Sequence, residues 1–252
     1  MEDPIEGLRG GVVLAELGGY GDGAYCARHG RGASLVKLGT YIVDPGSEVP
    51  YHPRFVFPPD RGSYAEYLRE NISAARASGA LVGVSVVSIE LADTLEFLRT
   101  AQENGADFLS LCAHSTMEMF VRAGTSSALC AERNWERLRE WARAILAFAR
   151  VPVIFKVGAE DTPDSIRAVG EIAKAGIPVV HINVGATDPG SPGLRILEGL
   201  RGACPLLIAS GGIREIGNAR AALQAGADAI AIGSAAMHDA GLCGRIRSAL
   251  SG

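Results

Sequence analysis

The sequence predicts one α/β domain, a (β/α)8 TIM barrel that spans residues 1–252. Eight apolar runs of strand length alternate with amphipathic helical patterns along the chain. Runs such as Val151–Val157 and Ile177–Asn183 are almost continuously apolar, which is typical of parallel strands covered on both faces. The length of 252 residues fits one barrel of roughly 250 residues and is short for two α/β domains.

The eight strands are expected in a regular order. They are Val12–Leu17, Ser34–Gly39, Leu81–Val87, Asp107–Cys112, Val151–Val157, Ile177–Asn183, Cys204–Ala209 and Asp228–Ile232. The helices between them end at a glycine before the next strand, as Gly105, Gly176 and Gly226 indicate. This repeated pattern predicts parallel strands joined by helices throughout.

One long irregular segment interrupts the pattern at Thr40–Gly62. It contains five prolines and separates the second strand from a helix expected to begin near Ser63. Loops longer than about 15 residues in a compact domain are usually functional or disordered, and this one leaves the face where barrel enzymes hold their active sites. We therefore predict an active-site loop, with a proline-stiffened surface insertion as the alternative.

Composition argues against several classes of protein. The net charge of −4 provides no general basic field, so a nucleic acid is not favoured as a partner. The five cysteines are scattered without a C-x-x-C pair, and no metal site is predicted. Without a leader-like N-terminus or an apolar run of about 20 residues, we expect a cytoplasmic protein that does not contact membranes. The sequence leaves open whether it forms a homo-oligomer.

Glycines after the last two strands predict a phosphate site. Ser210, Gly211, Gly212 and Ile213 follow the seventh strand, and Gly233-Ser234 follows the eighth. Glycine lets backbone N–H groups approach a ligand closely, and a helix N-terminus adds partial positive charge. In TIM barrels, the loops after strands seven and eight frequently bind phosphate.

Polar side chains at the ends of two neighbouring strands mark a candidate active site. Lys156 ends the fifth strand, where its ammonium needs an anion or a polar ligand. It either faces a ligand or forms an ion pair with Glu16 or Asp188. His181, near the end of the next strand, either meets a ligand oxygen or is a satisfied core histidine. Asn183 lies two residues further, so its side chain points the same way as that of His181.

Five segments form an ordered series of motifs. Leu14–Asp22 is similar to A-P-M-x-G-x-T-D, and Arg122–Leu129 is similar to R-A-G-x-G-x-x-L. Val151–Lys156 is similar to P-V-T-V-K, Val180-His181 to a V-H strand end, and Ala209–Ile213 to a phosphate-holding glycine turn. In this order the motifs resemble those of flavin-dependent dihydrouridine synthases and their shorter archaeal-type relatives. The resemblance covers most of the chain.

The resemblance implies FMN across the mouth of the barrel, with its phosphate at Ser210–Ile213 and Gly233-Ser234. Lys156 would then face the flavin, where a cation stabilises the negative charge that the ring gains on reduction. The family's other flavin-facing positions correspond to Ala15, Leu17, Ser85, His181 and Asn183.

The chain departs from the family at the position of the catalytic acid. Where the short relatives have I-N-A-H-C, this chain places Cys112, His114 and Ser115, with Ser115 at the cysteine position. A cysteine thiol has a pKa of about 8.5, whereas an unassisted serine is a far poorer acid. Ser115 acts with help from His114, or His114 or Cys112 has replaced it, or the protonation step is lost. Ser115 equally fits the cap of a helix beginning at Thr116.

Further departures lie beside the expected flavin. Glu16 and Leu17 replace a proline and a methionine, and no glutamine occurs next to Ser85, where the family contacts the ring edge. Ser234 replaces an arginine that supports the phosphate, which leaves more of that task to backbone N–H groups. Glu16 is either a general base, a contact to a substrate amine, or the partner that neutralises Lys156.

The sequence therefore predicts an FMN-dependent oxidoreductase, diverged from dihydrouridine synthases, that acts on a small conjugated or pyrimidine-like molecule. The catalytic candidates are Ser115, His114, Lys156, His181 and Glu16. The tRNA-binding domain of longer family members has no counterpart here, so tRNA is not expected as a substrate. One alternative is a flavin-independent lyase, isomerase or aldolase on a phosphorylated molecule, with Lys156 as a Schiff-base lysine. Another is a non-catalytic descendant that binds FMN or phosphate.

Overall fold

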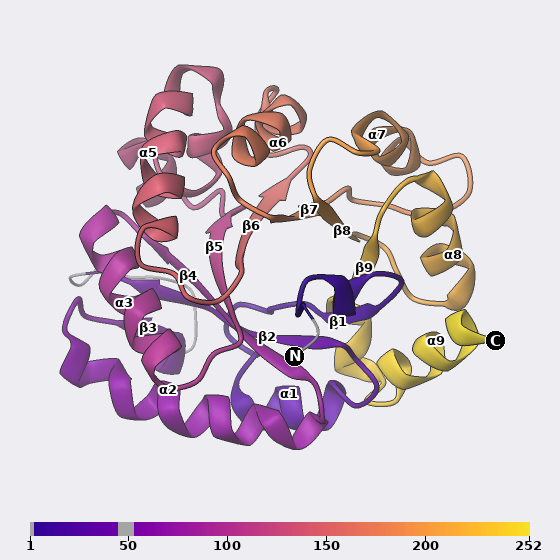
Figure 1. Cartoon of the computed structure of the whole chain (residues 1–252), viewed down its shortest axis with the longest axis horizontal. Coiled ribbons are helices and arrows are strands. Elements are labelled where there is room, and N and C mark those ends of the chain that lie inside the picture. Colours follow the sequence, from indigo (N-terminus) through magenta and orange to yellow (C-terminus); the bar gives the residue numbers. More distant parts are fainter. Residues whose placement is uncertain (1–2, 45–52) are drawn as a thin grey trace.

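Eight parallel strands close into a barrel in the computed structural model, which describes residues 3–44 and 53–252 (Figure 1). Closure comes from β1 (Val12–Leu14), which pairs with both β2 (Leu35–Val43) and β9 (Ala229–Ile232). The other strands follow in sheet order as β8 (Leu206–Ser210), β7 (Val179–Asn183), β6 (Val153–Gly158), β5 (Phe108–Ala113) and β4 (Leu81–Ser88). The predicted (β/α)8 TIM barrel is confirmed.

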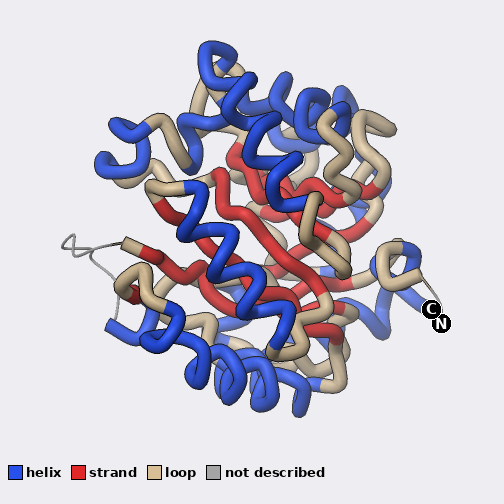
Figure 2. The backbone as a smooth tube through the Cα atoms, turned by 60° about the vertical axis from the view of Figure 1, so that its left-hand side comes forward, coloured by secondary structure: helices blue, strands red, loops and turns tan. Residues whose placement is uncertain are grey.

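Helices surround the strands, as the outer tubes of Figure 2 show. They are α1 (Gly23–His29), α2 (Arg61–Ala75), α3 (Leu91–Glu103), α4 (Glu118–Ala123), α5 (Trp135–Leu146), α6 (Ser165–Lys174), α7 (Pro192–Leu200), α8 (Ile216–Ala225) and α9 (Leu242–Ser251). Short 3-10 helices are η1 (Glu6–Leu8), η2 (Pro53–Phe55), η3 (Arg76–Ser78), η4 (Ser126–Cys130), η5 (Glu132–Asn134) and η6 (Ser234–His238). In the described part of the chain, every helix is too short or too polar to cross a lipid bilayer.

The segment predicted as an irregular loop, Thr40–Gly62, is more ordered than expected where it is described. β2 runs on to Val43, and Val56–Phe57 forms a short strand, β3, that pairs with it in parallel. The helix α2 begins at Arg61 rather than near Ser63. The predicted boundaries were therefore wrong, because the consecutive apolar residues Tyr41, Ile42 and Val43 extend the strand, which pairs with β4 as far as Val43.

Aromatic packing holds both ends of this segment. The ring of Tyr41 stacks on Phe55 at 5.3 Å between centroids and meets Phe57 at 5.9 Å. Within its described residues, only Thr40 lines the cavity at the barrel mouth. Residues 45–52 lie outside the described residues, so the active-site role of this loop stays a prediction.

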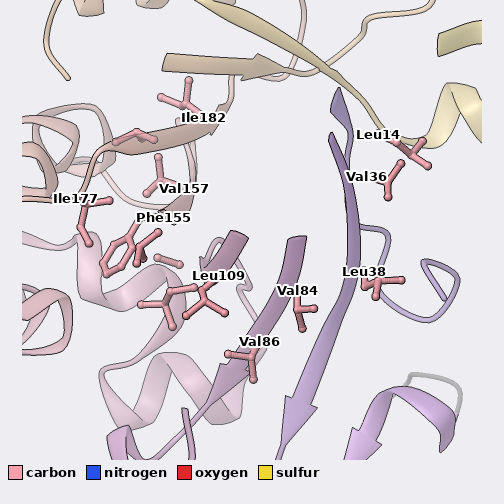
Figure 3. Close-up of a cluster of buried hydrophobic side chains, with 14 of the residues drawn as sticks. Leu14, Val36, Leu38, Val84, Val86, Leu109, Phe155, Val157, Ile177 and Ile182 are labelled. Carbon is pink, nitrogen blue, oxygen red and sulfur yellow. The ribbon is translucent and has the colours of Figure 1, made fainter. Parts of the chain in front are cut away.

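The apolar core forms two layers on either side of the strands. Inside the barrel, Val13, Leu35, Phe108, Ile154 and Val179 pack with Leu8 of η1. Outside it, side chains such as Val36, Leu38, Val84 and Phe155 face the helices (Figure 3). Because neighbouring residues of a strand point to opposite faces, each strand supplies both layers.

Candidate active site

Polar side chains form the next interior layer of the barrel. Lys37, Lys156 and His181 each lie two residues after an apolar residue of the inner core, on β2, β6 and β7. The strand period of two turns all three side chains into the barrel, nearer the carboxyl ends of the strands. Glu16, two residues after the end of β1, lies within 4 Å of all three side chains.

Glu16 is the centre of this buried cluster. Lys37 Nζ lies 2.9 Å from both carboxylate oxygens of Glu16, and Lys156 Nζ lies 3.4 Å from Oε1. The side chains of Lys37 and Glu16 are 0% and 1% exposed, whereas that of Lys156 is 11% exposed. With both lysines protonated, the cluster carries one uncompensated positive charge, and Lys156 is the lysine that reaches the cavity.

The surroundings of Glu16 favour its ionised form. Burial by itself would raise the pKa of Glu16, but the positive charges of Lys156 and Lys37 outweigh burial and lower it well below its usual range. Burial lowers the pKa of Lys37, while the neighbouring carboxylate of Glu16 opposes that change. Lys37 and Glu16 therefore form a buried ion pair. Removal of either partner would leave the other charge buried without compensation, which strongly destabilises the folded protein.

His181 is a buried member of the same network. Its side chain is 0% exposed and lines neither part of the cavity described below. Lys37 Nζ lies 3.4 Å from Nδ1, and because an ammonium only donates, Nε2–H donates to Ser210 Oγ at 2.9 Å. Burial, followed by the charges of Lys37 and Lys156, lowers the pKa of His181 well below its usual value. The arrangement matches the satisfied core histidine that the sequence left open.

A cavity of about 450 Å³ lies above the cluster, at the carboxyl ends of the strands. We call it the glycine compartment, after the glycines Gly185, Gly211, Gly212 and Gly233 in its wall. Ten predicted cofactor-binding residues line it: Ala15, Leu17, Lys156, Asn183, Ser210, Gly211, Gly212, Ile213, Gly233 and Ser234. The structure places these residues around one cavity, and their role in cofactor binding stays a prediction.

Backbone geometry explains the glycines in this wall. Gly211 has φ +111°, and a Cβ there would lie 2.6 Å from Gly185 N and 2.7 Å from Asn183 Oδ1. Gly212 has φ +69°, a region that favours glycine. Among the hydrogen bonds of the described residues, none uses the N–H of Gly212 or Ile213. The turn thus presents backbone donors, and Arg214 belongs to the same wall.

A second cavity of about 370 Å³ adjoins the first. We call it the cysteine compartment, after Cys112, and its wall also includes Thr40, His114, Ser115 and Asp161. The two compartments share Glu16, Leu17, His114 and Lys156. Burial raises the pKa of the Cys112 thiol, which makes it a weaker proton donor than an ordinary cysteine.

His114 lies in a hydrogen-bonded chain on the wall between the compartments. Nδ1 is 2.7 Å from Asp161 Oδ2, and Nε2 is 3.3 Å from Asn183 Nδ2. Gly185 N donates to Asn183 Oδ1 at 3.0 Å, which orients the amide. His114 is 27% exposed and Asp161 10%, so the chain is accessible from the cavity yet largely shielded.

Ser115 also lines the cysteine compartment, but its hydroxyl is engaged with the backbone. Ser115 Oγ accepts a hydrogen bond from Met117 N at 3.3 Å. The helix after it, α4, begins at Glu118 rather than at Thr116, so the predicted helix start was wrong by two residues. The contact resembles the capping role that the sequence offered as an alternative.

Ser85 differs from the expected placement. It is 0% exposed, lines neither compartment, and donates to Glu16 Oε1 at 3.4 Å. Lys156 pairs with Glu16, whereas Asp188, the other proposed partner, accepts from Asn218 at 3.1 Å. The carboxylate of Glu16 is thus contacted by side chains from several strands, including Ser85 on β4 and Lys156 on β6.

Three site residues were missed by sequence reasoning: Lys37, Asp161 and Arg214. Lys37 could have been found from the sequence, because it lies within the apolar run Leu35–Val43. Like Lys156, a lysine in an apolar strand needs an anion or a polar ligand for its ammonium. Asp161 and Arg214 lie in loops, where no periodicity fixes a side chain's direction. Within residues 3–44 and 53–252, no group of three or more His, Cys, Asp or Glu side chains is arranged to hold a metal ion.

Comparison with known proteins gives a likeness of fold. No protein family and no curated protein sequence matches the chain. Among solved structures, a mutant of morphinone reductase in complex with tetrahydroNAD superposes with a TM-score of 0.71 at 16% sequence identity. The superposition covers 95% of this chain and 87% of that one, so the barrel is shared over nearly its whole length.

Proposed function

We propose that this chain is a flavin-dependent oxidoreductase that binds FMN in the two adjoining compartments. The observation that carries the proposal is the position of Lys156, whose ammonium belongs to a buried cluster with one surplus positive charge and borders both compartments. A cation at this point stabilises a ligand that becomes more negative during the reaction, as a flavin does on reduction.

The glycine compartment suits the phosphate end of the cofactor. Gly211 and Gly212 leave no side chain between the backbone and a ligand, and their turn precedes α8. Arg214 is a cationic residue of the same wall, and its side chain would supply positive charge that Ser234, in place of the family's arginine, does not. The donor set of N–H groups and a guanidinium therefore fits a phosphate ester.

The cysteine compartment would receive a small substrate beside the ring. Bound FMN would supply hydride transfer, while Lys156 would hold the carbonyl or enolate oxygen of the ring or the substrate. The compartment has about 370 Å³, which suits a small conjugated or pyrimidine-like molecule and not a nucleic acid. Descent from dihydrouridine synthases is part of this proposal, and the name of the structurally similar morphinone reductase agrees with reductive chemistry.

FMN titration tests the proposal. Flavin fluorescence is followed as apo-protein is added, for the wild type, Lys156→Ala and the surface variant Lys174→Ala, whose side chain is 74% exposed. We expect the wild type and Lys174→Ala to bind alike, and Lys156→Ala to bind about tenfold more weakly, as for the loss of one charged contact. Wild-type protein that leaves FMN fluorescence unchanged would refute the proposal.

A second candidate rests on the position of Lys156 at the wall of both compartments. The unprotonated amine of such a lysine would condense with a carbonyl substrate to a Schiff base and release water, so a lyase, isomerase or aldolase on a phosphorylated molecule also fits. Borohydride reduction in the presence of glyceraldehyde 3-phosphate would then add mass at Lys156 but not in Lys156→Ala. Binding of FMN without any turnover would instead favour a non-catalytic descendant.

A further inference from the structure

We propose that His114, held by Asp161 and Asn183, is the proton-transfer group of the cysteine compartment, in place of Ser115. The inference deepens the proposed function, because it concerns the same site. It does not need the flavin, since the hydrogen bonds that carry it lie wholly within this chain.

The hydrogen-bonded chain defines which nitrogen of His114 holds the proton. Gly185 N–H donates to Asn183 Oδ1, so the amide turns its Nδ2–H groups toward His114 Nε2. An amide nitrogen only donates, so Nε2 accepts with its lone pair. Nδ1 therefore carries the hydrogen and donates it to Asp161 Oδ2 at 2.7 Å.

Gly158 leaves room for the contact between His114 and Asp161. A Cβ on Gly158, at the end of β6, would lie 2.5 Å from both carboxylate oxygens of Asp161 and closer still to His114 Nδ1. No side chain fits there while the imidazole and the carboxylate keep their contact. Gly158 thus allows the pair to pack directly against the strand, which restricts rotation of both groups.

The chemistry follows from the tautomer. In the neutral form, Nε2 is a base on the wall shared by both compartments, with Asp161 behind it to stabilise the imidazolium that forms when a proton arrives. The O–H, N–H or activated C–H bond of a substrate breaks, the proton moves to the Nε2 lone pair in place of the 3.3 Å contact from Asn183 Nδ2, and the electron pair stays on the substrate as an oxyanion or enolate. The ammonium of Lys156 borders the same cavity and stabilises that negative charge.

Ser115 is less suited to this task. Its hydroxyl already accepts a hydrogen bond from Met117 N. An imidazole exchanges protons far more readily than a serine hydroxyl, and the contact with Asp161 fixes the orientation of His114. The substrate class is therefore a small carbonyl compound with an acidic hydrogen next to the carbonyl group. Asp161 is a positioning residue in this assignment, because it acts on the substrate through His114.

Nitrogen NMR on apo-protein with 15N-labelled histidine tests the assignment. His114→Gln identifies the signals, and His181 serves as an internal standard because its contacts require the opposite tautomer, with the hydrogen on Nε2. We expect wild-type His114 to hold its hydrogen on Nδ1. In Asp161→Ala this preference should weaken, because only Asn183 then favours it, while the His181 signals persist; Glu160→Ala, an exposed neighbour, should leave both unchanged.

The rate at which diethyl pyrocarbonate acylates His114 is a second test, because this rate would be the same in the variants if Asp161 had only a structural role. The reagent attacks the unprotonated nitrogen, so we expect His114 to react in the wild type and about tenfold more slowly in Asp161→Ala and Gly158→Ala, as for the loss of one charge-assisted hydrogen bond. Wild-type His114 with its hydrogen on Nε2, or equal acylation rates in all variants, would overturn the inference. Neither result depends on FMN, so failure here is distinguishable from failure to bind the cofactor.

Discussion

Lys37 lies 2.9 Å from the carboxylate of Glu16 in the interior of the barrel, where neither side chain is more than 1% exposed. The pair joins β2 to the end of β1 beneath the cavity. Because Lys37 neutralises Glu16 from below, the ammonium of Lys156 keeps a net positive effect on the compartments above. Lys37 thus sets the charge of a cavity that it does not line.

Replacement of Lys37 should be strongly destabilising. Lys37→Met leaves Glu16 buried with only the more distant Lys156, and we expect the free energy of unfolding to fall by about 3–5 kcal/mol in urea titrations. The surface variant Lys174→Met should lose about 0–1 kcal/mol. Adding Glu16→Gln to Lys37→Met should recover part of the loss, and an equal loss in the two lysine variants would contradict the ion-pair argument.

The stability of the protein should fall as the pH drops from 7 to 5, in part through His181. The folded state lowers the pKa of His181, so the unfolded chain binds a proton below about pH 6.5 that the folded protein does not. The contribution is a slope of up to about 1.4 kcal/mol per pH unit, with less stability at the lower pH. His181→Gln should flatten the measured dependence, and the exposed His238→Gln should not; equal slopes in all three proteins would argue against a neutral buried His181.

The glycine turn should distinguish phosphorylated from unphosphorylated flavin. Gly211→Ala forces a Cβ against Gly185 and Asn183, so we expect FMN affinity to fall by about tenfold or more, corresponding to about 1.4 kcal/mol. Riboflavin, which lacks the phosphate, should lose less. Gly199→Ala is the control, because no atom lies within 4 Å of its added Cβ. Equal losses for both flavins would place the phosphate elsewhere.

Ser115 should contribute to stability through its contact with the backbone. Removal of the hydroxyl in Ser115→Ala leaves the N–H of Met117 without its acceptor, and we expect a loss of about 0.5–2 kcal/mol in thermal or urea unfolding. Ser115→Asn supplies another acceptor at the same place and should restore most of it. A Ser115→Ala protein as stable as the wild type would show that the hydrogen bond has no net value.

Much of the fold follows from local sequence patterns. The eight strands were predictable because parallel strands buried on both faces are apolar along their length and because glycines end the helices before them. The extension of β2 was not, since Pro45 and the prolines after it indicated a loop immediately after Gly39. Tertiary packing of Tyr41 against Phe55 and Phe57 outweighed that local signal.

The candidate site was predictable where strands or glycine turns fix the chain. Lys156 and the turn at Gly211 fall on the cavity for this reason. The sequence could not choose between the two alternatives for His181, because its burial depends on contacts with distant residues such as Lys37 and Ser210. Asp161 likewise lies in an irregular loop after β6, where spacing along the sequence carries no information about contact with His114.

The pairing of β1 with β9 has a consequence for synthesis of the protein on the ribosome. The wall of the glycine compartment contains Ala15 and Ala235, so the first and the last strand of the barrel meet beside this cavity (Figure 1). A nascent chain lacking β9 has an open sheet edge at β1 and only part of this cavity wall, and such long-range pairing forms slowly. A cofactor bound here would contact residues next to both strands. It would therefore bind only the closed barrel and would stabilise the pairing of β1 with β9.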